Sequence, residues 1–370
     1  MGTPVHDMKL ALHEVHEALG ARFGEVAGAE VVLHYGDPGP EHQALTSSAA
    51  VLDLGFRGRI CLTGADRVRL LHGQVTNDLQ SLQPLQGCYA AFVTNKGKMQ
   101  SDAFVYALPD ELLVDVEPGR APALLGRLEH YIVADDVQAI DVAPHYGLLS
   151  VQGPASARVL ERIALVPHPP QAPLQVAHAP DPVLGDVYVA RNPRTGSDGF
   201  DLFVPLAAAP MLLDKLAAAA RDESGRLAGW SALELARIEA AIPRFGADMD
   251  DSNLPPEAGI ASRAISYTKG CYIGQEVIAR LRTYGQVAKA LRTLRISGDG
   301  TVPAAGDRLL REGKDVGYVT SVARSARLGG TVALGYVRRE CNGPGTALVV
   351  QTRDGEVAAT VSGPPFSPVA

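Results

Sequence analysis

The spacing of apolar residues separates an N-terminal region of alternating helices and strands from a C-terminal region of strands alone. Apolar residues recur at steps of three and four between Met8 and Phe23, which predicts an amphipathic helix over about 7–24. A short apolar run at 31–36 then predicts a strand that ends at a glycine. We expect both elements to supply packing rather than chemistry.

From residue 50 to about 143, short apolar runs alternate with stretches of helical spacing. The runs predict strands at 58–63, 89–94, 102–108 and 112–116, and the helical spacing predicts helices at 65–71 and 122–131. This order, with its short loops, is typical of a ferredoxin-like α+β unit.

The next region, to residue 285, again mixes both patterns. It predicts a strand running into a helix start at 148–154, paired strands at 186–191 and 199–205, and helices at 211–221 and 230–241. Six prolines within 166–182 indicate an irregular surface connection. Beyond residue 285, short apolar runs separated by glycine and proline predict a small β-barrel or sandwich. The predicted strands are at 287–296, 316–322, 331–337, 347–351 and 357–361.

One cysteine stands out because of its local setting. A strand-like run ends at Tyr267, Gly270 supplies a turn, and apolar residues then recur at helical spacing, so Cys271 is expected at a helix start. Backbone N–H groups and the helix dipole there favour a thiolate, and Lys269 adds a positive charge. The alternative is a small buried apolar residue, because no histidine lies close in sequence to act as its base.

The octet around this cysteine resembles the signature of the YgfZ-type folate-binding proteins. These include a mitochondrial iron–sulfur assembly factor and belong to the superfamily of the glycine cleavage T protein, an aminomethyltransferase. The matching residues are Lys269, Gly270, Cys271, Tyr272, Ile273, Gly274, Gln275 and Glu276.

The resemblance implies a role for most of these positions. Lys269 would tune the thiol of Cys271, and the two glycines, Gly270 and Gly274, would permit the turn and a close approach. Gln275 and Glu276 would cap the helix. A purely structural use of Glu276 is an ion pair with a residue four positions later, Arg280.

The resemblance continues through 76–79, Tyr89 and 95–102, but with one departure. T proteins carry two adjacent aspartates where this chain has Ser101 and Asp102. A serine hydroxyl cannot replace a carboxylate as a base near neutral pH, which argues against aminomethyl transfer. Asp102 either orients a ligand or is a capping or turn residue.

By the same resemblance, a reduced folate such as tetrahydrofolate would bind in a central cavity through Tyr89, Asp102, Arg237 and Glu239. For the last two residues the alternative is a salt-bridged surface helix. Two further departures affect this expectation, because Ser197 stands where T proteins have a pterin-reading glutamate and Leu233 replaces an arginine.

The implied architecture is of the α+β class, a three-domain T-protein-like ring. It has a ferredoxin-like domain at 50–145 and a second α+β domain at 146–285, on which residues 1–49 pack. A C-terminal barrel occupies 286–370. A length of 370 residues, with 46% hydrophobic and 20% charged residues, agrees with two or three soluble domains.

Charge and cysteine content narrow the function classes. The net charge of −7 argues against general coating of nucleic acid. A local basic segment, residues 262–295, would attract an anionic folate tail or an RNA backbone through Arg263, Lys269, Arg280, Arg282, Lys289, Arg292 and Arg295.

The widely spaced Cys61, Cys88, Cys271 and Cys341 predict free thiols in a reducing compartment and no bound metal. With no leader-like start and no apolar span, we expect a cytoplasmic protein that does not enter a membrane.

Three functions follow. The first, from the cysteine octet, is a folate-binding accessory protein in assembly or repair of iron–sulfur proteins, acting with these proteins or their assembly machinery and affecting tRNA-modifying cluster enzymes. The second is a tetrahydrofolate-dependent aminomethyltransferase or related demethylase. The third, an adaptor that binds tRNA directly, is disfavoured because aromatics, at 5% of residues, supply no stacking platform.

Overall fold

The computed structural model describes residues 9–298 and 300–363. Internal contacts divide the chain into two compact units, each assembled from separated segments. Unit 1 consists of Met1–His72, Leu79–Tyr89 and Ala103–Ala236, and unit 2 of Gly73–Asp78, Ala90–Asp102 and Arg237–Ala370. Two strands described below, β5 and β6, therefore contribute residues to both units.

Unit 1 contains a six-stranded sheet in the order β10-β11-β12-β9-β3-β13. Its strands are β10 (Val176–Asp181), β11 (Gly185–Arg191), β12 (Gly199–Pro205), β9 (Tyr146–Gln152), β3 (Ala50–Asp53) and β13 (Arg226–Leu227). All neighbours pair antiparallel except β13, which runs parallel to β3.

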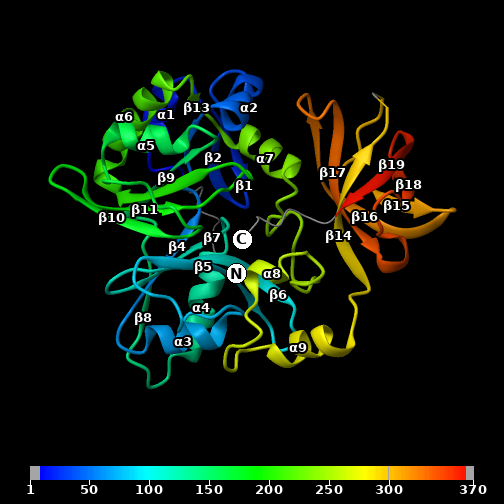
Figure 1. Ribbon diagram of the computed structural model, residues 1–370, viewed down its shortest axis with the longest axis horizontal. Coiled ribbons are helices and arrows are strands. Elements are labelled where there is room, and N and C mark those ends of the chain that lie inside the picture. The colour runs from blue at the N-terminus through cyan, green and yellow to red at the C-terminus, as the bar shows by residue number, and fades with distance from the viewer. Residues whose placement is uncertain (1–8, 299, 364–370) are drawn as a thin grey trace, which may run out of the picture. The chain divides into compact units, whose positions relative to one another are not determined.

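Helices α5 (Ser156–Ile163) and α6 (Ala209–Asp222) pack on one face of this sheet, as Figure 1 shows. One apolar cluster joins them to Leu202, and a second cluster on the other face includes the neighbouring Phe203. Because both faces are covered, β12 is buried along almost its whole length and its sequence does not alternate.

A five-stranded sheet has the order β5-β6-β7-β4-β8. The strands are β5 (Gln86–Val93), β6 (Met99–Ala107), β7 (Leu112–Val116), β4 (Gly58–Thr63) and β8 (Gln138–Asp141), and α3 (Arg67–Gln74) and α4 (Ala121–Tyr131) accompany them. The expected strands and helices are confirmed in order; β4 and β7 have the predicted bounds, and the ends of the others are shifted. Only β8 was not predicted, because it is short and mostly exposed.

The N-terminal helix is much shorter than its apolar spacing predicts. Helix α1 covers His13–Ala18 and ends before Gly20, which has a positive φ of 80°. The chain then forms a hairpin of β1 (Arg22–Val26) and β2 (Ala29–His34), followed by α2 (Pro38–Ser47). The two hairpin loop residues, Ala27 and Gly28, both have positive φ, as a tight type I′ turn requires. The predicted helical residues 7 and 8 lie outside the described residues.

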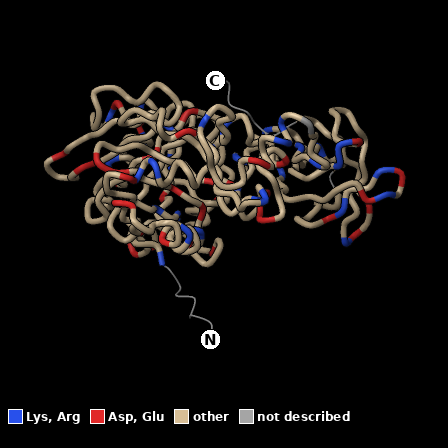
Figure 2. Tube along the Cα trace, turned by 90° about the horizontal axis from the view of Figure 1, so that it is seen from below, with Lys and Arg blue, Asp and Glu red and all other residues tan. Residues whose placement is uncertain are grey.

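Unit 2 contains the predicted barrel, closed in the order β14-β17-β16-β15-β18-β19. Its strands are β14 (Lys289–Ile296), β15 (Arg308–Arg311), β16 (Lys314–Ser325), β17 (Gly330–Arg338), β18 (Ala347–Thr352) and β19 (Gly355–Gly363). Closure leaves no unpaired strand edge. Figure 2 shows acidic and basic residues interspersed along its trace rather than gathered by sign.

The remaining helices follow the six-stranded sheet in sequence. They are α7 (Trp230–Glu239), α8 (Ala261–Ala264) and α9 (Gln275–Tyr284), with two single 3-10 turns at Leu206–Ala208 and Arg339–Cys341. Helix α8 replaces the strand-like run expected before the cysteine. Among the described residues, no helix is long and apolar enough to cross a membrane.

Candidate functional site

The cysteine of the octet lies in the loop between α8 and α9. Helix α9 begins at Gln275, so Cys271 is not at a helix start as expected. The physical reason is Gly274, which adopts a left-handed conformation with φ of 83° and delays the helix. Cys271 is exposed and has a free thiol, so the alternative of a small buried apolar residue is wrong.

Lys269 is a largely buried member of the octet, with 8% of its surface exposed. Its Nζ donates hydrogen bonds of 2.8 Å to the carbonyl oxygens of Val75 and Asn77, and it lies 5.0 Å from the ring centre of Tyr272. These contacts fix the octet to the segment 73–78. Lys269 therefore has a clear structural use, and its predicted effect on the thiol stays a prediction.

Gly274 makes the close approach expected of it. A Cβ at this position would lie 2.4 Å from the carbonyl oxygen of Thr94, closer than packed atoms allow, and 3.3 Å from the Cα of Gly97, which is a tight contact. Ile273 N donates to Gly73 O over 3.2 Å, which fixes the same loop from the other side. Within unit 2, the octet thus packs between two short segments from early in the chain.

The two last residues of the octet do not cap α9 in the expected way. The Gln275 side chain donates to the carbonyl of Gly270 over 3.3 Å, which closes the loop on the helix. Glu276 pairs instead with Arg280 at 3.0 Å, the structural alternative, and both side chains are exposed. The pair therefore contributes little to stability.

Several cations of the basic segment have partners inside unit 2. Arg282 lies over the ring of Tyr267 at 4.2 Å, and Arg292 donates to the Asn342 carbonyl. Lys289 donates to the Tyr318 hydroxyl at 3.1 Å. These partners are neutral, so they fix the positions of the three cations without cancelling their charge.

Arg237 and Glu239 join the end of α7 to the barrel. Arg237 is buried and donates to Asp248 and, over 2.8 Å, to the hydroxyl of Ser321. Glu239 accepts from Ser325 and, over 2.7 Å, from Arg327. The alternative of a salt-bridged surface helix is wrong for Arg237, because this side chain is buried. The expected contact of both residues with a folate stays a prediction.

Ser101 and Asp102 occupy successive positions on β6. Ser101 is fully buried, and its hydroxyl donates to the Asp102 carbonyl over 2.8 Å. Successive side chains of a strand point to opposite faces, so Asp102 shares its face with Phe104 rather than with Ser101. Asp102 lies within a strand, so it is not a turn residue.

Tyr89 belongs to an aromatic and cationic row within unit 1 that the sequence reading missed. The ring of Phe104 lies 5.1 Å from that of Tyr89, and the guanidinium of Arg194 lies 5.1 Å from the Phe104 ring centre. Tyr89 is buried, whereas Phe104 is only half-buried. Phe104 is therefore the more accessible of the two aromatic rings.

Arg194 is fixed by a buried charge network. It donates to Asp201 over 2.7 Å and to Asp115 over 2.6 Å, and Asp115 also accepts from Arg57 over 2.7 Å. Burial alone raises the pKa of Asp115, but Arg57 and Arg194 outweigh it and hold that pKa below its usual range. A charged residue inside the apolar strand β7 was the available sequence signal.

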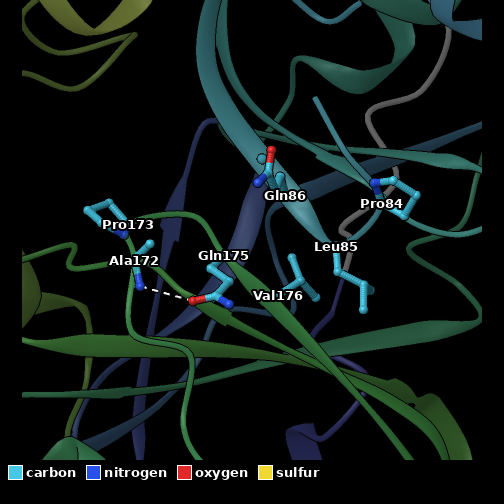
Figure 3. A pocket seen from close by; sticks show the side chains of 8 residues that line it. Pro84, Leu85, Gln86, Ala172, Pro173, Gln175 and Val176 are labelled. Atoms are coloured by element: carbon cyan, nitrogen blue, oxygen red, sulfur yellow. Dashed lines mark hydrogen bonds between the residues drawn. The ribbon is translucent and has the colours of Figure 1, made fainter. Parts of the chain in front are cut away.

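A pocket of about 540 Å³ in unit 1 lies between the start of β5 and the segment before β10 (Figure 3). Its lining is uncharged and consists of Pro84, Leu85, Gln86, Gly87, Ala172, Pro173, Gln175 and Val176. The Gln175 carboxamide oxygen accepts from Ala172 N over 3.0 Å. These lining residues offer no charged side chain to pair with the carboxylates of a folate.

The other thiols and acidic groups suggest no further chemistry. The buried Cys61 donates to Glu111 over 2.8 Å, and burial followed by this hydrogen bond raises its pKa to about 12. Within residues 9–298 and 300–363, no group of three or more His, Cys, Asp or Glu side chains is arranged to hold a metal ion.

The two-sheet N-terminal part and the closed six-stranded barrel together define a T-protein-like fold. The aminomethyltransferase T of the glycine cleavage system from Bartonella henselae superposes with a TM-score of 0.88, covering 98% of this chain and 100% of that one at 24% sequence identity. This likeness shows the fold and confirms the expected α+β architecture with its barrel.

Sequence comparison gives the family. The chain matches the GCVT N-terminal domain over residues 12–269 and the glycine cleavage T-protein C-terminal barrel domain over 289–367. It therefore belongs to the glycine cleavage T-protein family. An aminomethyltransferase of Saccharopolyspora erythraea is 31% identical, covering 96% of both chains, and one of Streptomyces coelicolor is 30% identical, covering 91% of both.

These relatives overturn the first of the three functional hypotheses. Proteins similar over their full length are named aminomethyltransferases, so the expected accessory function in iron–sulfur assembly is wrong. Neither iron–sulfur partners nor an effect on tRNA modification has support among them. The prediction of function from the octet was wrong because the octet covers only eight residues, whereas the similarity to aminomethyltransferases extends along the chain.

Proposed function

We propose that the protein is a folate-dependent one-carbon transferase of the aminomethyltransferase class. The observation that carries this proposal is the 31% identity to an aminomethyltransferase across 96% of both chains. Tetrahydrofolate, or another reduced folate, would be the acceptor, and its nitrogens would take the transferred carbon. From an aminomethyl donor, the carbon would form one C–N bond to each of two folate nitrogens while its bonds to the amine and to the carrier protein break. The two protons displaced from the folate nitrogens would leave with the amine and with the carrier group.

Asp102 is the residue to which we assign the carboxylate function in this transfer. It is buried to 7% exposure on β6, where a charge acts strongly because little water screens it. Ser101 cannot share the task, because its hydroxyl is fully buried and bonded to the Asp102 carbonyl. A single carboxylate would therefore orient the donor amine and stabilise its positive charge.

The surroundings support a folate in part. A pterin needs a flat aromatic or apolar wall, and Tyr89 with the half-buried Phe104 supplies one. Arg237 and Glu239 are left out of this proposal because both are bonded to barrel residues.

Within the family, we place the chain in the YgfZ-type branch on the basis of Lys269 to Glu276. In this branch the octet would serve mainly to fix segments 73–78 and 94–97, as its contacts with Val75, Asn77 and Thr94 suggest. Covalent chemistry at Cys271 is not part of the proposal. The cytoplasmic location expected from the unpaired cysteines stays a prediction.

The test is transfer of a one-carbon unit to tetrahydrofolate from two donors, a protein-bound aminomethyl group and an N-methylated glycine. We expect turnover with one of them, and a fall of about 10²–10⁴-fold in kcat for Asp102→Asn. Asp315→Asn, which alters an exposed barrel ion pair, is the matched control and should leave kcat unchanged. Wild-type protein that binds folate but transfers carbon from neither donor would refute the transferase assignment.

A further inference from the structure

Phe104 is the member of the unit 1 aromatic row that is best placed to contact a ligand. It is half-buried, whereas Tyr89 keeps 6% of its surface exposed and the Arg194 side chain 8%. Tyr89 lies tilted at 43° on one side of it, and the Arg194 guanidinium lies over its ring. The ring is thus held by two neighbours while part of its surface stays accessible.

The orientation of Arg194 is fixed by hydrogen bonds. Its Nε lies 3.1 and 3.0 Å from the two carboxylate oxygens of Asp201, and its Nη2 bonds Asp201 and Asp115. The planar guanidinium is therefore clamped from β12 and β7, and it cannot rotate away from Phe104 without breaking buried charge-assisted bonds. A lysine would keep the charge but lose this fork.

Asp201 is held in turn by neutral donors. The hydroxyl of Ser150 donates to it over 2.8 Å, and the amide of Asn192 donates over 2.9 Å. Asn192 also lies 3.2 Å from the hydroxyl of Tyr106, which is on the same face of β6 as Phe104. Together with Asp115, the network thus connects four strands, β6, β7, β9 and β12.

We propose that Phe104 is the ring on which the pterin of the folate stacks, and that Arg194 is a positioning residue that holds Phe104 in place. This inference rests on the proposed function, because the pterin is the flat heterocycle that the transferase would bind. It assigns binding specificity to two residues that the family resemblance did not indicate. Arg194 acts through Phe104 and does not itself touch the ligand.

The assay is calorimetric binding of three ligands: a reduced folate, a reduced pterin without the tail, and the p-aminobenzoylglutamate fragment without the pterin. Phe104→Leu keeps an apolar side chain and removes the aromatic face. We expect about 5- to 10-fold weaker binding of both pterin-containing ligands, the loss of one aromatic stack. Binding of the fragment should be unchanged.

Arg194→Lys should weaken binding of the same two ligands by about 3- to 5-fold, again without affecting the fragment. Arg191→Gln is the matched control, because Arg191 lies three residues before Arg194 and pairs with Asp198 at 2.9 Å. It should bind all three ligands like wild type. Each variant is measured well below its own melting temperature, so that a loss of stability does not imitate a loss of affinity.

The outcomes separate this inference from the function on which it rests. If wild-type protein binds none of the pterin-containing ligands, the folate proposal fails and this one fails with it. If wild type binds them and Phe104→Leu binds equally well, only the stacking assignment is wrong. Equally weaker binding of all three ligands by Arg194→Lys would show that Arg194 has a general structural role and would overturn its assignment as a positioning residue. If Arg194→Lys does not fold, Phe104→Leu still decides the stacking assignment.

Discussion

Replacing Asp115 by asparagine tests whether the buried charge network stabilises unit 1. Asp115 is fully buried and accepts from two arginines, Arg57 at 2.7 Å and Arg194 at 2.6 Å. Asp115→Asn leaves their positive charges in a dry site with one counter-charge fewer. Removing one partner of a buried ion pair costs about 3–5 kcal/mol. Total stabilities are about 5–15 kcal/mol, so the effect is large.

The assay can be confined to unit 1 because the single tryptophan of the chain, Trp230, lies there against Phe56. Urea unfolding followed by tryptophan fluorescence therefore reports on this unit. With a slope near 2–3 kcal/mol/M, the expected cost corresponds to a midpoint lowered by about 1–2.5 M at pH 7. Asp135→Asn, which removes the partner of the exposed Arg69, is the control and should cost at most about 1 kcal/mol.

The effect should also depend on pH with a definite sign. The pKa of Asp115 is lower in the folded protein than in the unfolded chain, where it is about 3.9. A depressed carboxyl pKa stabilises the fold above about pH 4, and this contribution is lost as the pH falls through the folded-state pKa. The difference between wild type and Asp115→Asn should therefore shrink in acid. A midpoint shift below about 0.3 M at pH 7, or one that is equal at pH 3 and pH 7, would refute the reasoning.

Two further predictions concern the octet and the thiols. Gly274→Ala should destabilise unit 2 by about 2–4 kcal/mol in calorimetry, and the control Gly246→Ala should cost about 1 kcal/mol. Both glycines have positive φ, but of the two only Gly274 would have a carbonyl oxygen 2.4 Å from the added Cβ. Equal losses of stability would contradict the close approach. Alkylation at pH 9 should label the exposed Cys271 well before Cys61. The pKa of Cys61, about 12, leaves about one in a thousand of its side chains in the reactive thiolate form at this pH. Comparable labelling rates of both cysteines in native protein would show that Cys61 is not buried.

The sequence predicted elements well where burial alone decides the pattern. The strand expected at 58–63 has those bounds as β4, because its apolar centre, residues 60–62, is buried as is typical of a strand covered on both faces. Prediction from the sequence failed where a turn or a sheet edge determines the structure. The residues of strand β10 were interpreted as irregular because of their prolines. Strand β10 lies at the edge of its sheet, where a proline is tolerated because the outer side of the strand pairs with no further strand.

The site was predictable only as far as local residues reveal it. The octet was recognised in sequence, but its position before α9 depends on the left-handed Gly274, which no apolar spacing reports. Phe104 and Arg194 are 90 positions apart in sequence, and their contact follows from how β6 and the segment after β11 come together. Long-range charge pairs such as Arg194 with Asp115 have no local periodicity, so they could not be found without the fold.

The discontinuity of unit 2 has a consequence for how the chain matures during synthesis. Lys269 bonds to Val75, which was made 194 residues earlier. At about 5–20 residues per second, a ribosome needs about 10–40 s to produce the partner of that segment. For this time the apolar residues at 90–93 lack the second half of their unit. Completion of unit 2 is therefore paced by translation, and a ribosome stalled before residue 237 would hold a chain that chaperones recognise.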